Sequence, residues 1–342
     1  MAILEFLLGV CLAAVTIRDV FDTVVVPGES HGTLHLTRRI VFATLPAWRL
    51  IGSRRGVPTS FAPFALMASF ILWMLLLSLA FGLMGHALRN DFRPPPKSLP
   101  DAIYAVGSCL IGLGLSGGSQ ATGAVRFVIL AAGFFGLAVM TMAVTYLLEV
   151  QGGIANRDAG IIKLTTSAGE PPSGIALLER FAQLDFKDHV PEVMRNGREW
   201  CAQVHQSHAS HPSLVYFRSK GTGSGWPAAL GALLDLALTV ELLIDAPAWR
   251  GLATLLREDG GRMVHSLVDL VGLEQEPAPP TSQDVEQLLV RLAEAGYALR
   301  PQPDLEAFCV QRARHAGCVR SMASHLGSAE APLLGKVSAN AT

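Results

Sequence analysis

Long apolar segments occupy most of the first 150 residues and predict helices that cross a membrane. The clearest covers residues 61–88, which contain no Asp, Glu, Lys or Arg. A second covers residues 125–148, where Arg126 is the only charged residue, and a third covers residues 1–27. About 20 mostly apolar residues suffice for a helix to span the hydrocarbon core of a bilayer. The pattern therefore predicts three transmembrane helices.

A shorter apolar helix precedes the segment 125–148 and ends in a glycine-rich run. Ser98, Pro100 and Asp101 are typical of a helix start, with a hydroxyl cap, a proline and an acidic first turn. The helix over residues 101–111 would rise only about 16 Å, roughly half a bilayer. Residues 112–118 then read Gly-Leu-Gly-Leu-Ser-Gly-Gly. Irregular backbone at membrane depth must be buried in protein or line water, so this run predicts a ring of inward carbonyls that filters cations. The alternative is a flexible extracellular loop between two transmembrane helices.

These segments resemble the pore region of the two-helix potassium-channel fold. The resemblance lies in Ala102-Ile103-Tyr104, in Ser108, in Leu113-Gly114-Leu115 and in the glycines of the next helix. Residues 19–27 also look like the first helix of a bacterial three-span subgroup. The family filter reads Thr-Val-Gly-Tyr-Gly, often followed by Asp, and the aligned residues here are Gly112, Leu113, Gly114, Leu115, Ser116 and Gly117. The missing threonine, second glycine and acidic residue make the filter degenerate, so potassium selectivity does not follow from the resemblance.

The resemblance implies a homotetrameric cation channel in the lipid bilayer, because one chain supplies one quarter of a filter. Conduction would be passive, with a monovalent cation, K⁺, as the permeant ion and no other cofactor. Two alternatives remain open. The protein could be a non-conducting membrane-anchored scaffold or sensor with a decayed filter, or a non-selective cation channel.

The helix over residues 125–148 contains further candidate residues. Ala138, Thr141 and Thr145 recur at three and four residues, so they share one face. We expect this face to line the pore; the alternative is that the threonine hydroxyls bond to their own helix backbone. Gly133 and Gly136 mark either a close-packing face or a bending point.

Charges at the end of the first helix have two interpretations. Arg18 and Asp22 are four residues apart and can meet on one helix face. Together with Asp19 they form either an ion pair at the membrane interface or a coupling point between this helix and the pore helices.

Loop charge predicts the orientation of the chain. Residues 28–60 contain five arginines and one acidic residue, Glu29, interleaved with apolar and aromatic positions. Because loops rich in Lys and Arg stay on the cytoplasmic side, this segment is predicted to lie on the inner surface of the cell membrane. The N-terminus is then outside, and the C-terminal half is cytoplasmic.

Residues after 150 show the helical period of a water-exposed domain. Helices are predicted over residues 174–186, 191–208, 226–243, 249–271, 282–298 and 305–325. The most apolar, 226–243, is interrupted by Asp235 and Glu241 and is interpreted as a buried core helix. The parts of this all-α membrane protein are residues 1–27 (first transmembrane helix), 28–60 (basic interfacial segment), 61–150 (pore domain with its re-entrant helix and filter), 151–326 (helical cytoplasmic domain) and 327–342 (frayed tail).

Composition and residue spacing mainly exclude classes of partner, ligand and activity. The chain of 342 residues is half hydrophobic with a formal net charge of −1, so nothing favours a nucleic-acid partner. Its five cysteines show no paired spacing and are interpreted as reduced. Cys201, His205 and His208 share a helix face, but no complete zinc ligand set follows. No nucleophile–base arrangement indicates an enzyme, and no ligand of the cytoplasmic domain is indicated.

Overall fold

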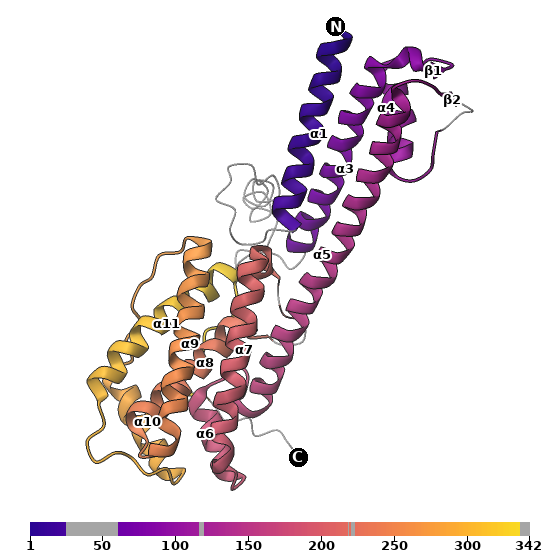
Figure 1. Cartoon of the computed structure of the whole chain (residues 1–342). Coiled ribbons are helices and arrows are strands. Elements are labelled where there is room, and N and C mark those ends of the chain that lie inside the picture. The colour runs from indigo at the N-terminus through magenta and orange to yellow at the C-terminus, as the bar shows by residue number, and fades with distance from the viewer. Residues whose placement is uncertain (25–60, 116–119, 218, 220–222, 336–342) are drawn as a thin grey trace. The chain divides into compact units, whose positions relative to one another are not determined.

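The computed structural model of the chain describes residues 1–24, 61–115, 120–217, 219 and 223–335 (Figure 1). Their structure is mainly helical; the two strands among them, β1 (Phe92–Arg93) and β2 (Gln120–Ala121), form one antiparallel pair. The described residues divide into a first compact unit, which ends at Glu149, and a second one, which contains Phe61 and the residues from Val150 onward. The predicted basic segment lies outside the described residues.

Three helices among the described residues are long and apolar enough to cross a membrane. They are residues 63–87 of α3 (Phe61–Ala87), α5 (Val125–Ala168) and the segment Gly225–Leu243. The first two correspond to predicted transmembrane helices. The first helix, α1 (Ala2–Val24), forms as predicted, but every stretch of 18 residues in it contains at least three charges, so it does not meet the same criterion.

The first unit is built from α1, α3, α5 and the short helix α4 (Leu99–Leu110). Figure 1 shows α4 beside α3 and α5. Large side chains of α3 fill the centre, where Trp73, Leu77 and Phe81 are almost completely buried. The same core cluster receives Val20 from α1, Val106 and Leu110 from α4, and Val125, Val128, Ala132 and Val139 from α5. Burying these apolar side chains fixes α4 on the two long helices.

The α5 helix is longer than predicted: it continues past Glu149 as one helix of 44 residues. Its later part buries Arg157, Ile161, Leu164 and Ala168, three to four residues apart, which is one helix face. The buried Arg157 donates from Nη1 to the Leu214 carbonyl at 3.2 Å and from Nε to Asp158 at 3.1 Å. The expected helix end at residue 149 was therefore wrong, because an amphipathic pattern replaces the apolar one without interrupting the backbone hydrogen bonds.

The second unit surrounds a buried helix, α8 (Gly225–Leu238), which runs into a short π-helical turn at Thr239–Leu243. Every residue of α8 after Gly225 is buried, and 89% of the apolar stretch is enclosed by the protein, which agrees with the predicted core helix. Helices α6, α7, α9 and α11 contact it (Figure 1). The bounds of the outer helices are α6 (Gly174–Gln183), α7 (Val190–Ser210), α9 (Pro247–Val271), α10 (Ser282–Glu294) and α11 (Leu305–Leu326).

A charged cluster explains why the core helix can hold an acid. Asp235 is 2% exposed, accepts a hydrogen bond from His315 Nε2 at 2.9 Å and lies 3.2 Å from Arg312 Nε. Arg312 and His315 both lie on α11, so their contacts with Asp235 join α11 to α8. A buried carboxylate is tolerated when it is paired in this way.

The predicted frayed tail is wrong for residues 333–335. Leu333 is buried, and its carbonyl accepts a hydrogen bond from Ser173 Oγ at 2.9 Å. Gly335 donates to the same hydroxyl at 3.2 Å and accepts from Arg291 at 2.8 Å. One apolar anchor and three hydrogen bonds therefore hold residues 333–335 on the second unit.

Candidate functional site

The start of the predicted filter is a glycine strip, residues 111–115, that follows directly from α4. Ser98 caps α4 as predicted, accepting a hydrogen bond from the Asp101 backbone N–H at 3.4 Å. At the other end, Gly112 N donates to the Cys109 carbonyl at 3.1 Å and Leu113 N donates to the Ser108 carbonyl at 2.9 Å. These bonds satisfy carbonyls that a helix end would otherwise leave bare.

Two positions in the strip require glycine. Gly112 has a φ of +83° and Gly114 a φ of +79°, and among the described residues none beyond the adjacent ones lies within 4 Å of either position for a β-carbon. Backbone geometry rather than crowding selects glycine there, because a side chain strains this left-handed region. The potassium-channel filter has threonine at the position aligned with Gly112, and this φ value disfavours a threonine there.

Ser108 holds the strip against α4. Its hydroxyl lies 2.8 Å from the Ala105 carbonyl and 2.6 Å from the Gly114 carbonyl. A hydroxyl has one proton, so it donates to one of these carbonyls at a time. Sequence patterns singled out Ser108 through the family resemblance, but its contact with Gly114 depends on the turn at residues 111–113 and was not foreseeable from spacing.

The strip is exposed in the single chain. Ile111 is 51% exposed and Leu113 is 77% exposed, although both are large apolar residues. Leu115 is half-buried against the core of the first unit. The remaining predicted filter residues, Ser116 and Gly117, lie outside the described residues.

Both ends of the segment that carries α4 and the strip meet at one place. In the β1–β2 pair, Phe92 lies opposite Ala121 and Arg93 opposite Gln120. The backbone carbonyl of Asp91 accepts from Thr122 N and Oγ1, each at 2.8 Å. Its carboxylate accepts from the Ala124 backbone N–H at 2.9 Å, at the start of α5. The chain therefore leaves and returns to the same end of α3 and α5.

The two glycines of α5 have different surroundings. A β-carbon on Gly136 would lie 1.9 Å from the Leu110 carbonyl oxygen, whereas one on Gly133 would lie 3.6 Å from the Cys109 carbonyl, an ordinary contact. The end of α4 thus approaches α5 more closely at Gly136 than at Gly133. These distances favour the close-packing interpretation for Gly136 and leave Gly133 without a steric requirement.

The three predicted pore-lining residues differ in exposure. Thr141 and Thr145 are exposed, and Ala138 is half-buried. Thr141 Oγ1 donates to the Leu137 carbonyl at 2.9 Å, and Thr145 Oγ1 donates to the Thr141 carbonyl at 3.1 Å. The hydroxyl protons are used within the helix, as in the alternative interpretation, while the oxygens still present lone pairs outward.

The charges of the first helix divide into two groups. Arg18 Nε lies 3.6 Å from Asp22 Oδ2, so the expected contact across one helix turn is present. Asp19 is 4% exposed and accepts a hydrogen bond from Trp73 Nε1 of α3 at 2.7 Å. At the other end of α1, Glu5 Oε1 lies 2.7 Å from His86 Nδ1, also of α3. Polar contacts therefore join α1 to α3 near both of its ends.

Cys201, His205 and His208 are not brought together as a metal-ligand set in the described part of the chain. No group of three potential ligands is close enough to hold a metal ion among the described residues. Burial, with a smaller effect of Asp259, raises the pKa of the Cys201 thiol to about 12, so it stays protonated at neutral pH. The buried His208 uses Nδ1 for a 2.8 Å contact with the Val204 carbonyl.

Comparison with known proteins adds no relative to this description: no protein-family model, curated protein or solved structure matches the chain.

Proposed function

We propose that the chain is one quarter of a potassium-channel-like cation channel. Four copies would surround a central axis, with α4 as a re-entrant pore helix and the backbone carbonyls of residues 113–116 as ion ligands. Ala138, Thr141 and Thr145 would line an inner cavity. The first residue would lie outside the cell and the second unit in the cytoplasm, as loop charge predicts.

The observation that carries the proposal is the way α4 ends. A helix of 12 residues, too short to cross a bilayer, stops in a strip whose two glycines adopt positive φ angles. The strip exposes apolar side chains, and the β1–β2 pair closes the segment on the side where it began. A surface loop has no need for this anchored, half-length helix. A filter needs both the helix and the closed return.

One contact favours the non-conducting alternative. The Gly114 carbonyl, a proposed ion ligand, already accepts a hydrogen bond from Ser108 at 2.6 Å. A carbonyl oxygen has a second lone pair, so the bond does not abolish ion binding, but it competes with it. In a scaffold with a decayed filter, Ser108 would simply satisfy this carbonyl.

Ion flux from liposomes that contain the purified protein distinguishes these functions. Potassium and sodium gradients are compared side by side, after the oligomeric state has been measured. Potassium flux well above sodium flux supports an ordered filter, and equal fluxes support the non-selective channel. Absence of flux from a tetramer, both for the unmodified chain and for Ser108→Ala, contradicts conduction.

A glycine pair provides the matched variants. Gly114→Ala places a β-carbon at a φ of +79° and should abolish selectivity, whereas Gly133→Ala makes only an ordinary contact and should conduct like the unmodified protein. The double variant Ser116→Gly and Gly117→Asp, suggested by the family pattern, should sharpen potassium selectivity. It leaves Gly112 unchanged, because threonine would be strained there.

A further inference from the structure

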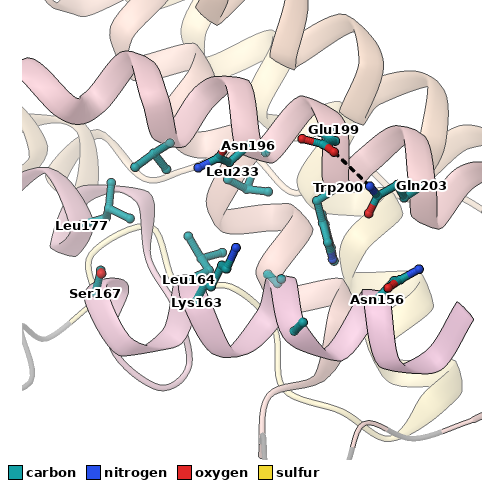
Figure 2. Close-up of a pocket in the computed structure, with 15 residues that line it drawn as sticks. Asn156, Lys163, Leu164, Ser167, Leu177, Asn196, Glu199, Trp200, Gln203 and Leu233 are labelled. Carbon is teal, nitrogen blue, oxygen red and sulfur yellow. Dashed lines mark hydrogen bonds between the residues drawn. The ribbon is translucent and has the colours of Figure 1, made fainter. Parts of the chain in front are cut away.

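The second unit contains a cavity of about 290 Å³ between the later part of α5 and helices α6, α7 and α8 (Figure 2). Its volume is near the lower limit for small-molecule sites, about 300 Å³, so the occupant would be about the size of an amino acid. All of its lining residues belong to the second unit, so it is independent of the glycine strip.

Opposite charges come from opposite walls of this cavity. Lys163 lies on α5 and Glu199 on α7, and both are exposed. In Figure 2, Lys163 points from its helix toward α7. Within the described part of the chain, its ammonium group has no ion-pair or hydrogen-bond partner. Glu199 accepts one hydrogen bond, from Gln203 Nε2 at 3.1 Å, which leaves most of its lone pairs for a ligand.

Two amides add neutral hydrogen-bonding capacity. Asn156 on α5 and Asn196 on α7 line the cavity, and the structure gives neither side chain a partner among the residues it describes. Each amide both donates and accepts, so the pair suits a ligand that carries both kinds of group.

Apart from Ser167 and Gln203, the rest of the lining is apolar. Trp200 is 6% exposed, and its Nε1 donates to the Arg157 carbonyl at 2.9 Å. A β-carbon on Gly160 would lie 2.1 Å from the Trp200 ring, so α5 and α7 are in direct contact beside the cavity. Figure 2 shows Leu177 at one end and Glu199 with Gln203 at the other. A preformed site loses little freedom when it binds a ligand.

We propose that this cavity binds a small zwitterion with one carboxylate, one ammonium group and a compact apolar side chain. Lys163 would pair with the carboxylate and Glu199 with the ammonium group. The two asparagines would complete the hydrogen bonds of the charged groups. Leu177 and Leu233 would contact the apolar side chain.

Isothermal titration calorimetry of the full-length protein in detergent micelles tests the proposal. The probes are glycine, L-leucine and L-phenylalanine, together with 4-methylpentanoate, which lacks the ammonium group, and 3-methylbutan-1-amine, which lacks the carboxylate. We expect saturable binding of at least one amino acid. The two analogues should bind at least about tenfold more weakly than L-leucine, because each leaves one charged residue unpaired.

Four variants separate recognition from general charge effects. Lys163→Met and Glu199→Gln should each weaken amino-acid binding at least about tenfold. Lys97→Met and Glu286→Gln alter exposed charges outside the cavity and should bind like the unmodified protein. All four sites are exposed, so circular dichroism should show unchanged folding.

Three results would overturn the proposal. The first is no binding of any of the three amino acids up to about 10 mM, a concentration well above a millimolar dissociation constant. The second is binding of 4-methylpentanoate as tight as that of L-leucine, which would identify an anion site. The third is unchanged affinity in both cavity variants. None of these results depends on ion flux, so failure here leaves the channel proposal untouched.

Discussion

Replacing Gly136 by alanine tests the close approach of α4 to α5. The added β-carbon would lie 1.9 Å from the Leu110 carbonyl oxygen and 2.7 Å from its carbon. Both are backbone atoms at the end of α4, so no side-chain rotation can relieve the clash. The end of α4 would have to move by about 1.5 Å to reach ordinary contact distance, and overpacking of this kind typically costs about 1–3 kcal/mol of unfolding free energy.

Gly133→Ala, three residues earlier on the same helix, is the matched control. Its β-carbon would lie 3.6 Å from the Cys109 carbonyl oxygen, which requires no movement. Replacing glycine by alanine inside a helix raises the free energy of unfolding by about 0.5–1 kcal/mol, and this gain is common to both variants. The free energies of unfolding should therefore differ by about 2 kcal/mol, with Gly136→Ala the less stable of the two.

Thermal unfolding in detergent, followed by circular dichroism, measures this difference. Each kcal/mol corresponds to about 2–4 °C for units of this size, so Gly136→Ala should melt at least about 4 °C below Gly133→Ala. Because α4 leads directly into the glycine strip, the same variant should also reduce any ion flux. Equal melting temperatures for the two variants would refute the close packing of α4 on α5.

Two further predictions concern other buried polar groups. Asp19→Ala should lower the free energy of unfolding by about 1–3 kcal/mol, because it leaves the indole N–H of Trp73 unpaired. Arg18→Ala removes an exposed side chain from its ion pair and should lower the free energy of unfolding by less than about 0.5 kcal/mol. Chemical denaturation measures both free energies, and equal losses would contradict the buried contact. Burial, aided by the charge of Arg157, lowers the pKa of His208 from 6.5 to about 3, so the unfolded chain binds more protons than the folded chain below pH 6.5. The contribution of His208 to stability should therefore be fully present above pH 6.5 and about 2 kcal/mol smaller at pH 5, and His208→Met should remove this part of the pH dependence in denaturation curves.

Local signals predicted the elements better than their ends. Ser98 and Asp101 correctly located the start of α4, because a capping hydroxyl and an acidic first turn act within four residues. The apolar run interrupted by Asp235 was correctly interpreted as a core helix, because its charge is incompatible with lipid unless it is paired. The residues that pair with it, Arg312 and His315, lie almost 80 positions away, so no local pattern could indicate them.

The candidate site was predictable in outline and not in detail. Glycine spacing indicated an irregular strip after a half-length helix, and residues 112 and 114 do adopt conformations that favour glycine. Sequence alone could not separate Gly133 from Gly136, because the difference is a backbone distance to another helix. It also missed Asp91, whose carboxylate binds the start of α5 from 33 residues away, since a single aspartate in a loop has no distinctive pattern.

The error about α5 has a physical cause that bears on both proposals. A helix is propagated by hydrogen bonds between backbone groups four residues apart, and these bonds form regardless of whether the surrounding side chains are apolar. The change near residue 149 is a change of environment, from side chains suited to lipid to an amphipathic pattern suited to a protein core. One continuous helix therefore follows the glycine strip at its start and supplies Lys163 near its end. If both proposals hold, a ligand in the cavity would contact α5, the same helix that lines the pore, and measuring ion flux with and without L-leucine would test that coupling directly.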